Sequence, residues 1–142
     1  MEKIQIVIDT NVLVAAFRSK RGAANLLLDR LNDGRWELNL SNALIAEYED
    51  VLLREEMREF VSPSEVEKSI NALCSISRFH DIFYLWRSSS ADPDDDFVIE
   101  LAVKANADFI ISFNKKHLAN SAEFGIRLVT PSEFLEQFGE LR

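Results

Sequence analysis

Apolar residues follow two different spacings along this chain, and segments of the two kinds alternate. Ile4–Ile8 is rich in isoleucine and valine, which is typical of an inner strand of a parallel sheet that is buried on both faces. Further short apolar or aromatic runs predict strands at 36–40, 80–86, 108–112 and 127–129. Between these runs, apolar residues recur at helical spacing, as in 22–33 and 97–105.

Capping residues predict where several helices begin and end. Gly34 is placed to end the helix of 22–33. Ser41 is a candidate N-cap for a helix running to about Leu53, and 55–60 continues or resumes helix. Three further starts carry a cap residue followed by proline at the first helical position. These are Ser62-Pro63, for a helix to about Ser77, Asp92-Pro93, and Thr130-Pro131, for a helix to about Gly139.

Strands that alternate with helices over the length of one domain predict the α/β class. Such an order favours a mainly parallel central sheet with helices on both faces. The chain has 142 residues, of which 47% are hydrophobic, so it can bury one substantial core. We therefore expect a single domain over 1–142.

Charge and cysteine content narrow the functional classes. The net charge of −8 argues against a protein that binds nucleic acid through a broad basic surface. It does not exclude nucleic acid, because a carboxylate site loaded with divalent metal is locally neutral or positive. One cysteine, Cys74, and the lack of a leader or a membrane-spanning apolar run predict a cytoplasmic protein with no membrane partner. Cys74 lies in a helical pattern, where we expect a buried structural thiol.

Two acidic residues, Asp9 and Glu47, lie at positions that exposure to water does not account for. Asp9 ends the first strand, at the sheet edge where α/β proteins bind ligands, although it could equally cap the helix that begins near Thr10. Glu47 lies three residues from Leu44 and four from Val51, at the margin of an apolar helix face. A carboxylate directed toward a core is paired, neutralised or bound to metal. The alternative for Glu47 is an ion pair with a residue such as Arg18.

A third acidic group opens the helix after the strand of 80–86. Asp92 is best explained as its cap, and acids in a first turn are stabilised by the helix dipole. Asp94 and Asp95 fit a solvated surface, whereas Asp96 precedes the first apolar residues and is best placed to point into a crevice. Basic residues follow two of the strands, and ordinary surface is the simplest explanation of both clusters. These are Arg18, Lys20 and Arg21 after the first, and Lys115, Lys116 and His117 after the strand of 108–112.

Four segments in this order resemble the PIN domain. They are Ile-Asp-Thr-Asn-Val-Leu at 8–13, Glu47, Asp-Pro-Asp-Asp-Asp at 92–96 and Ala-Asp-Phe-Ile-Ile-Ser at 107–112. The resemblance covers essentially the whole chain and is strongest to the toxins of bacterial toxin–antitoxin pairs. It implies a three-layer α/β/α, Rossmann-like PIN fold, metal-dependent cleavage of RNA, and an antitoxin protein and a homodimer as partners. The apolar segments 26–31, or Val51 with Leu52, are candidates for a dimer interface.

The resemblance also implies a site. Asp9, Glu47 and Asp96 match three catalytic, metal-binding acids, and the fourth acidic position is Asn114 here. Oxygen ligands without histidine or cysteine select Mg²⁺ or Mn²⁺, which activates water for attack on a phosphodiester. We expect Thr10, Asn11 and Ser112 to orient ligands or touch a phosphate, and Lys115 and Arg18 to meet the RNA backbone. Asn114 could instead merely shape the turn into Lys115.

Other classes with a doubly wound sheet fit less well. A phosphoacceptor receiver domain has paired acids after its first strand, whereas Asp9 is followed by Thr10 and Asn11. A haloacid-dehalogenase-type phosphatase has a second aspartate two residues beyond the first, where this chain has Asn11. The main alternative is a nuclease-like module that binds RNA or a protein partner without cleaving, weakened at Asn114.

Overall fold

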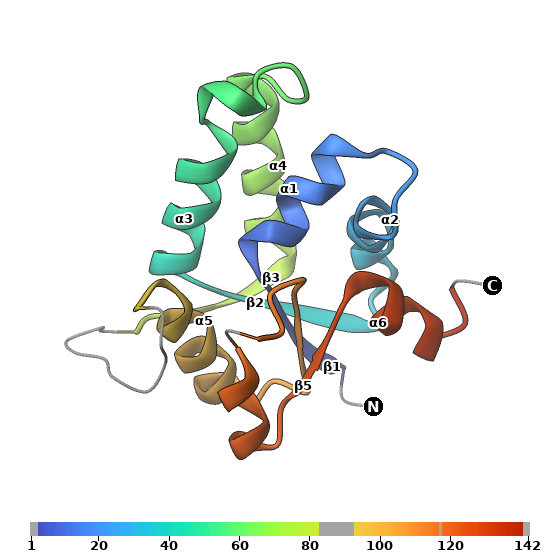
Figure 1. Cartoon of the computed structure of the whole chain (residues 1–142), viewed down its shortest axis with the longest axis vertical. Helices are drawn as coiled ribbons and strands as arrows, with labels where there is room; N and C mark the ends of the chain where they lie inside the picture. The colour runs from blue at the N-terminus through green and yellow to red at the C-terminus, as the bar shows by residue number, and fades with distance from the viewer. Residues whose placement is uncertain (1–2, 83–92, 117, 141–142) are drawn as a thin grey trace.

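The fold is built on a parallel sheet with the predicted first strand at its centre. The computed structural model describes residues 3–82, 93–116 and 118–140. Its sheet has the order β3-β2-β1-β4-β5, and every neighbouring pair is parallel (Figure 1). The strands are β1 (Ile4–Ile8), β2 (Trp36–Ser41), β3 (Ser77–His80), β4 (Phe109–Ile111) and β5 (Arg127–Val129).

Helices connect the strands as predicted, and most of the expected boundaries are confirmed. Ser62 and Thr130 each form a reciprocal capping box with the glutamate three residues on. Gly34 has a φ of 82°, the left-handed conformation that ends the 3₁₀ turn directly after the second helix. The α-helices are α1 (Thr10–Arg18), α2 (Ala23–Arg30), α3 (Asn42–Leu52), α4 (Pro63–Ile76), α5 (Pro93–Lys104) and α6 (Pro131–Gln137). Short 3₁₀ helices cover Leu31–Asp33, Glu55–Met57 and Ala119–Phe124.

The helices form a layer on each face of the sheet, which is the predicted three-layer α/β/α arrangement. Figure 1 shows α5 on one face and the helices α1, α2, α3, α4 and α6 on the other. The register places Ile6, Leu38 and Phe109 side by side. Phe134 of α6 packs against this face, with its ring centroid 5.2 Å from that of Phe109. Five parallel strands between two helical layers explain why β1 is apolar along most of its length.

Three sequence-based expectations were wrong in detail. The strand predicted at 80–86 begins at Ser77 instead, directly after α4, and 83–86 lie outside the described residues. β3 is an edge strand with partly exposed side chains, so its polar residues concealed it. Cys74 is exposed rather than buried. Val103, one of the apolar residues of the segment 97–105, is 40% exposed on α5 rather than packed.

The leucines considered for a dimer interface are mostly core residues. Leu27 of α2, Leu31 of the 3₁₀ helix that follows it and Leu52 of α3 are 0%, 5% and 1% exposed, because these side chains pack into the hydrophobic core. Of the residues that the structure describes, none forms a helix long and apolar enough to cross a membrane.

Candidate active site at the carboxyl edge of the sheet

The candidate site forms where the two central strands end. Asp9 follows β1 and Ser112 follows β4, and the backbone N–H of Asp9 donates to the carbonyl of Ile111 at 3.0 Å. Asp9 is 6% exposed and Ser112 is fully buried. The parallel pairing of β1 with β4 therefore brings together two residues that lie 103 positions apart in the sequence.

Asp9 both caps a helix and presents a buried carboxylate, so the two readings of this residue are compatible. Its Oδ1 accepts the backbone N–H of Thr10 at 2.9 Å, at the start of α1. Its Oδ2 accepts the hydroxyl of Ser112 at 2.7 Å. Burial raises the pKa of the Asp9 carboxyl above its usual value, although these two hydrogen bonds act in the opposite direction. The site thus holds an acid whose charge the protein only partly compensates.

Glu47 reaches the same place from α3. Its Oε1 accepts the hydroxyl of Thr10, the residue next to Asp9. Arg18, the alternative partner predicted for Glu47, instead lies over the ring of Phe60, with its guanidinium carbon 5.1 Å from the ring centroid. Arg18 is eight residues along α1 from Thr10, which corresponds to about 12 Å of helix. Arg18 is therefore not brought to the acids.

Tyr48 is a residue that the sequence reasoning missed. Its hydroxyl donates to the carbonyl of Ile8 at 2.5 Å, and its side chain is 1% exposed. This hydrogen bond ties α3 to the end of β1 and so positions Glu47, its neighbour in the sequence. Burial, followed by the charges of Asp9 and Glu47, raises the pKa of Tyr48 well above its usual value. The spacing of Leu44, Tyr48 and Leu52, the buried side chains of α3, was the available signal.

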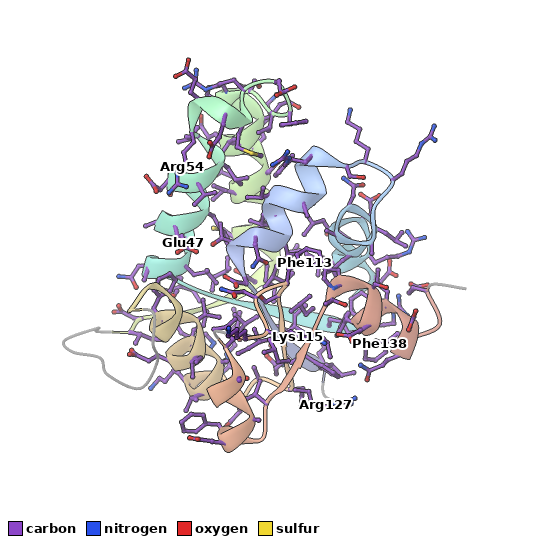
Figure 2. The ribbon with its side chains drawn as sticks, viewed as in Figure 1. Glu47, Arg54, Phe113, Lys115, Arg127 and Phe138 are labelled. Carbon is purple, nitrogen blue, oxygen red and sulfur yellow. The ribbon has the colours of Figure 1, made fainter. Side chains whose placement is uncertain are left out.

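Asn11 and Ser112 link the loop after β4 to the start of α1. The Asn11 amide donates to Ser112 Oγ at 3.2 Å and to Asp9 Oδ2 at 3.4 Å, and its carbonyl oxygen accepts the backbone N–H of Phe113 at 3.2 Å. Ser112 Oγ also accepts the backbone N–H of Asn114 at 2.9 Å. Figure 2 shows Phe113 in this loop, near the start of α1, and Glu47 on α3. Asn11 and Ser112 thus both donate hydrogen bonds to the Asp9 carboxylate and fix its orientation.

The third predicted acid is placed by its backbone only. Asp96 lies in the first turn of α5, and α5 runs back toward the start of β4, so its first turn is at the edge where Asp9 lies. The side chains of 93–96 lie outside the described residues, as do Asp92 and His117. Among the side chains that are described, no three acids, histidines or cysteines gather in a group able to hold a metal ion.

The two remaining predicted site residues, Lys115 and Asn114, both lie in the segment after β4. The Lys115 ammonium lies 2.5 Å from a carboxylate oxygen of Glu133, in the first turn of α6, and both side chains are nearly half exposed. Asn114 is half-buried, and its carbonyl oxygen accepts the backbone N–H of Leu118 at 3.3 Å. The backbone of Asn114 therefore takes part in the turn that follows β4, next to the site.

Comparison with known protein families identifies the family of this chain. The model of the PIN domain matches residues 5–116, which is most of the chain and includes β1, α3 and β4. The chain belongs to the PIN domain family. PIN domains are generally nucleases that use divalent metal ions. The resemblance noted in the sequence is thus confirmed at the level of the family.

A solved structure shows the same fold. The PIN domain described here is similar to a chain in the crystal structure of VapBC2 from Rickettsia felis bound to a DNA fragment from their promoter. The TM-score is 0.57 at 13% sequence identity, and the match covers 88% of this chain and 97% of that one. At this identity the likeness is one of fold alone. No sequence among the curated proteins matches the chain.

Proposed function

We propose that this PIN domain is a metal-dependent endoribonuclease, the toxin of a toxin–antitoxin pair. The observation that carries the proposal is the buried carboxylate of Asp9, bound to Ser112 and joined through Thr10 to Glu47 at the carboxyl edge of the sheet. A buried acid with a raised pKa, beside a second acid, is an unfavourable arrangement that a bound cation would relieve. Membership of a family of nucleases supports the same function.

The described donors fit a hard divalent cation. Asp9 and Glu47 offer carboxylate oxygens, and we assign Asp96 and Asn114 as further oxygen ligands on the basis of their sequence positions. A site of oxygen donors without sulfur or imidazole selects Mg²⁺ or Mn²⁺. When bound, such an ion lowers the pKa of a coordinated water and stabilises charge on the phosphodiester.

The surrounding residues hold these acids in place. Ser112 and the N–H of Thr10 favour the ionised form of Asp9, which is the form that binds a cation. Thr10 orients the Glu47 carboxylate through its hydroxyl, and Tyr48 anchors the helix that carries Glu47. Such supporting contacts set the orientation of metal ligands. The acids are thus hydrogen-bonded by Thr10, Asn11 and Ser112. We propose that these three residues also contact the substrate phosphate at the same edge of the sheet.

We propose that Lys115 and Arg18 contact the RNA backbone at the margins of the site. Lys115 is 45% exposed at its side chain, and its partner Glu133 is on the surface as well, so a phosphate can replace that carboxylate at low cost. Arg18 is exposed at the end of α1. Two cations of this kind position a strand without reading its sequence.

The partners follow from the toxin assignment. VapBC2, which includes a chain of similar fold, is a complex bound to promoter DNA. By analogy we propose that this chain also binds an antitoxin protein, forms a homodimer and acts in the cytoplasm. Co-expression with the product of a neighbouring small open reading frame, followed by co-purification, tests the antitoxin.

Asn114 supports a second candidate function. An amide has no negative charge, so it binds a cation more weakly than the acid that the family resemblance leads us to expect. In this second reading the PIN domain binds RNA or a protein partner without cleaving it. The two functions differ in whether a phosphodiester is broken.

A nuclease assay with matched variants distinguishes these functions. Purified protein is incubated with a labelled stem–loop RNA in Mn²⁺, in Mg²⁺ and in chelator. We expect cleavage with metal only, and loss of cleavage in Asp9→Asn and Glu47→Gln. Glu49→Gln is the control, because Glu49 is an exposed acid on the same helix. Binding without cleavage would support the second function, and metal-independent cleavage equal in all variants would refute the proposed site.

A further inference from the structure

An exposed aromatic residue directly follows Ser112 of the candidate site. Phe113 follows Ser112 and is 51% exposed. Within the described part of the chain it belongs neither to the hydrophobic core nor to the partly buried residues that pack against that core. Single exposed apolar side chains are common on protein surfaces, so exposure by itself assigns no role. Phe113 is singled out by its position, because it directly follows the serine that binds the buried Asp9 carboxylate.

The backbone of Phe113 is held in a defined position relative to Asp9. Its N–H donates to Asn11 Oδ1 at 3.2 Å, and the Asn11 amide in turn donates to Ser112 Oγ, the group that binds Asp9 Oδ2. The next residue is held too, because the N–H of Asn114 donates to Ser112 Oγ at 2.9 Å. Consecutive Cα atoms are about 3.8 Å apart. The Phe113 ring is thus presented from a backbone one residue beyond the Asp9 partner.

We propose that Phe113 is a stacking platform for an unpaired RNA base next to the phosphodiester that this site cleaves. The proposal rests on the ribonuclease function proposed above and adds a substrate-binding residue to it. Aromatic rings at exposed positions stack on bases of single-stranded nucleic acid, and they do so with little sequence preference because every base has a π-face.

The charge of the molecule favours a contact to RNA that needs no positive side chain. The net charge is −8, so no general electrostatic attraction draws RNA to the protein. Of the two cations proposed to meet the backbone, Lys115 is paired with Glu133 and Arg18 lies over Phe60. Stacking on Phe113 adds affinity that requires no positive charge and does not weaken with salt.

Another exposed phenylalanine provides a matched control. Phe124 is 53% exposed, almost the same as Phe113. It ends the 3₁₀ helix that precedes β5, next to Gly125 and close to Ile126 and Arg127, where β5 begins. Phe124 therefore lies toward the amino edge of the parallel sheet, whereas Phe113 follows β4 at the carboxyl edge. A loss of RNA binding that is specific to Phe113 cannot come from reduced surface hydrophobicity in general.

The test uses single-stranded RNA that carries the fluorescent base 2-aminopurine. Binding is measured in the Asp9→Asn background with Mn²⁺, and steady-state cleavage in the otherwise unaltered protein. We expect Phe113→Ala and Phe113→Leu to weaken binding about 5- to 150-fold, the range that corresponds to loss of one stacked base. KM should rise by a similar factor with a smaller change in kcat, and the 2-aminopurine quenching should disappear. Phe113→Trp should restore all three, and Phe124→Ala should resemble the unaltered protein.

Further readouts separate stacking from a structural effect. Because Phe113 is exposed, the melting temperature of Phe113→Leu should stay close to that of the unaltered protein. The dependence of log Kd on log salt concentration should keep its slope, because no ion pair is removed. Unchanged KM and quenching in Phe113→Leu, while RNA is still cleaved, would overturn this inference and leave the ribonuclease function standing. An unaltered protein that neither binds nor cleaves RNA would overturn both.

Discussion

Two fully buried serines allow a direct test of how the protein holds the Asp9 carboxylate. Ser112 and Ser121 are both 0% exposed. The Ser112 hydroxyl donates to Asp9 Oδ2 at 2.7 Å, whereas the Ser121 hydroxyl has no hydrogen-bond partner among the described residues. Replacement of each serine by alanine removes the same atom from an equally dry position. Only Ser112→Ala removes a contact to a charge.

The expected magnitudes follow from these contacts. A hydrogen bond to a charged group contributes about 1.5–3 kcal/mol, so Ser112→Ala should lower the free energy of unfolding by about 2 kcal/mol at pH 7. Ser112 Oγ also accepts hydrogen bonds from the side-chain amide of Asn11 and from the backbone N–H of Asn114. Both residues are half-buried, and the Asn11 amide can turn to water when the serine hydroxyl is removed. Ser121→Ala removes a buried hydroxyl without a partner, so it should be neutral or stabilise by up to about 1 kcal/mol.

The pH dependence has a definite sign. Ser112 lowers the pKa of Asp9, which burial raises, so Ser112→Ala should raise the pKa of Asp9 further. The cost of the substitution is therefore largest where Asp9 is ionised. It should shrink by about 1 kcal/mol as the pH falls through the raised pKa of Asp9, because the lost bond is then one between neutral groups.

Urea denaturation in chelator, at neutral pH and in steps down to about pH 4, measures both effects. In thermal melts, 2 kcal/mol corresponds to about 6 °C for a domain of this size. Equal stabilities of Ser112→Ala and Ser121→Ala at neutral pH would refute the assignment of Ser112 as a partner of a buried carboxylate. A cost for Ser112→Ala that does not change with pH would show that Asp9 is not the group concerned.

Three further predictions concern the site and the sheet. Millimolar Mn²⁺ should raise the melting temperature, and Glu47→Gln should reduce that shift; identical shifts in the two proteins would exclude Glu47 as a ligand. Asn114→Asp should tighten Mn²⁺ binding and increase cleavage, and calorimetric titrations with equal affinity and stoichiometry would remove Asn114 from the site. Burial, with the charges of Arg78 and Lys104, lowers the pKa of His80, so stability should fall as the pH drops from about 7 to 5. His80→Gln, which keeps a donor for Asn39 Oδ1, should flatten that profile, and an unchanged profile would contradict the assignment.

Features that depend on neighbouring residues were predicted from the sequence alone. The capping boxes at Ser62 and Thr130, and the left-handed Gly34, involve contacts within a few residues, so their sequence patterns predict them directly. The central position of β1 followed from its apolar composition, because a strand covered on both faces has little polar surface to place. The order of strands and helices then sufficed for the fold class.

The family pattern singled out Asp9 and Glu47 as candidate ligands, and Ser112 was proposed because it lies close to them in the predicted arrangement. What these residues contact was decided by the tertiary structure. The hydrogen bonds from Ser112 to Asp9 and from Thr10 to Glu47 join residues 103 and 37 positions apart. No local pattern determines such contacts, because they depend on how β1 and β4 pair and how α3 packs. For the same reason the anchoring role of Tyr48 escaped the sequence.

Long-range packing also decided the surroundings of the basic residues. Lys115 is neutralised by Glu133 on α6, and Arg18 rests on Phe60, beyond α3. In the sequence both residues simply follow a strand or a short helix and seem equally available to a phosphate. The early start of β3 has a related cause, because an edge strand is defined by its pairing with β2 and carries little hydrophobic signal of its own. The sequence thus determined the helices and strands and pointed to the candidate acids. Tertiary contacts determined the partners of those acids, because the partners come from distant segments of the chain.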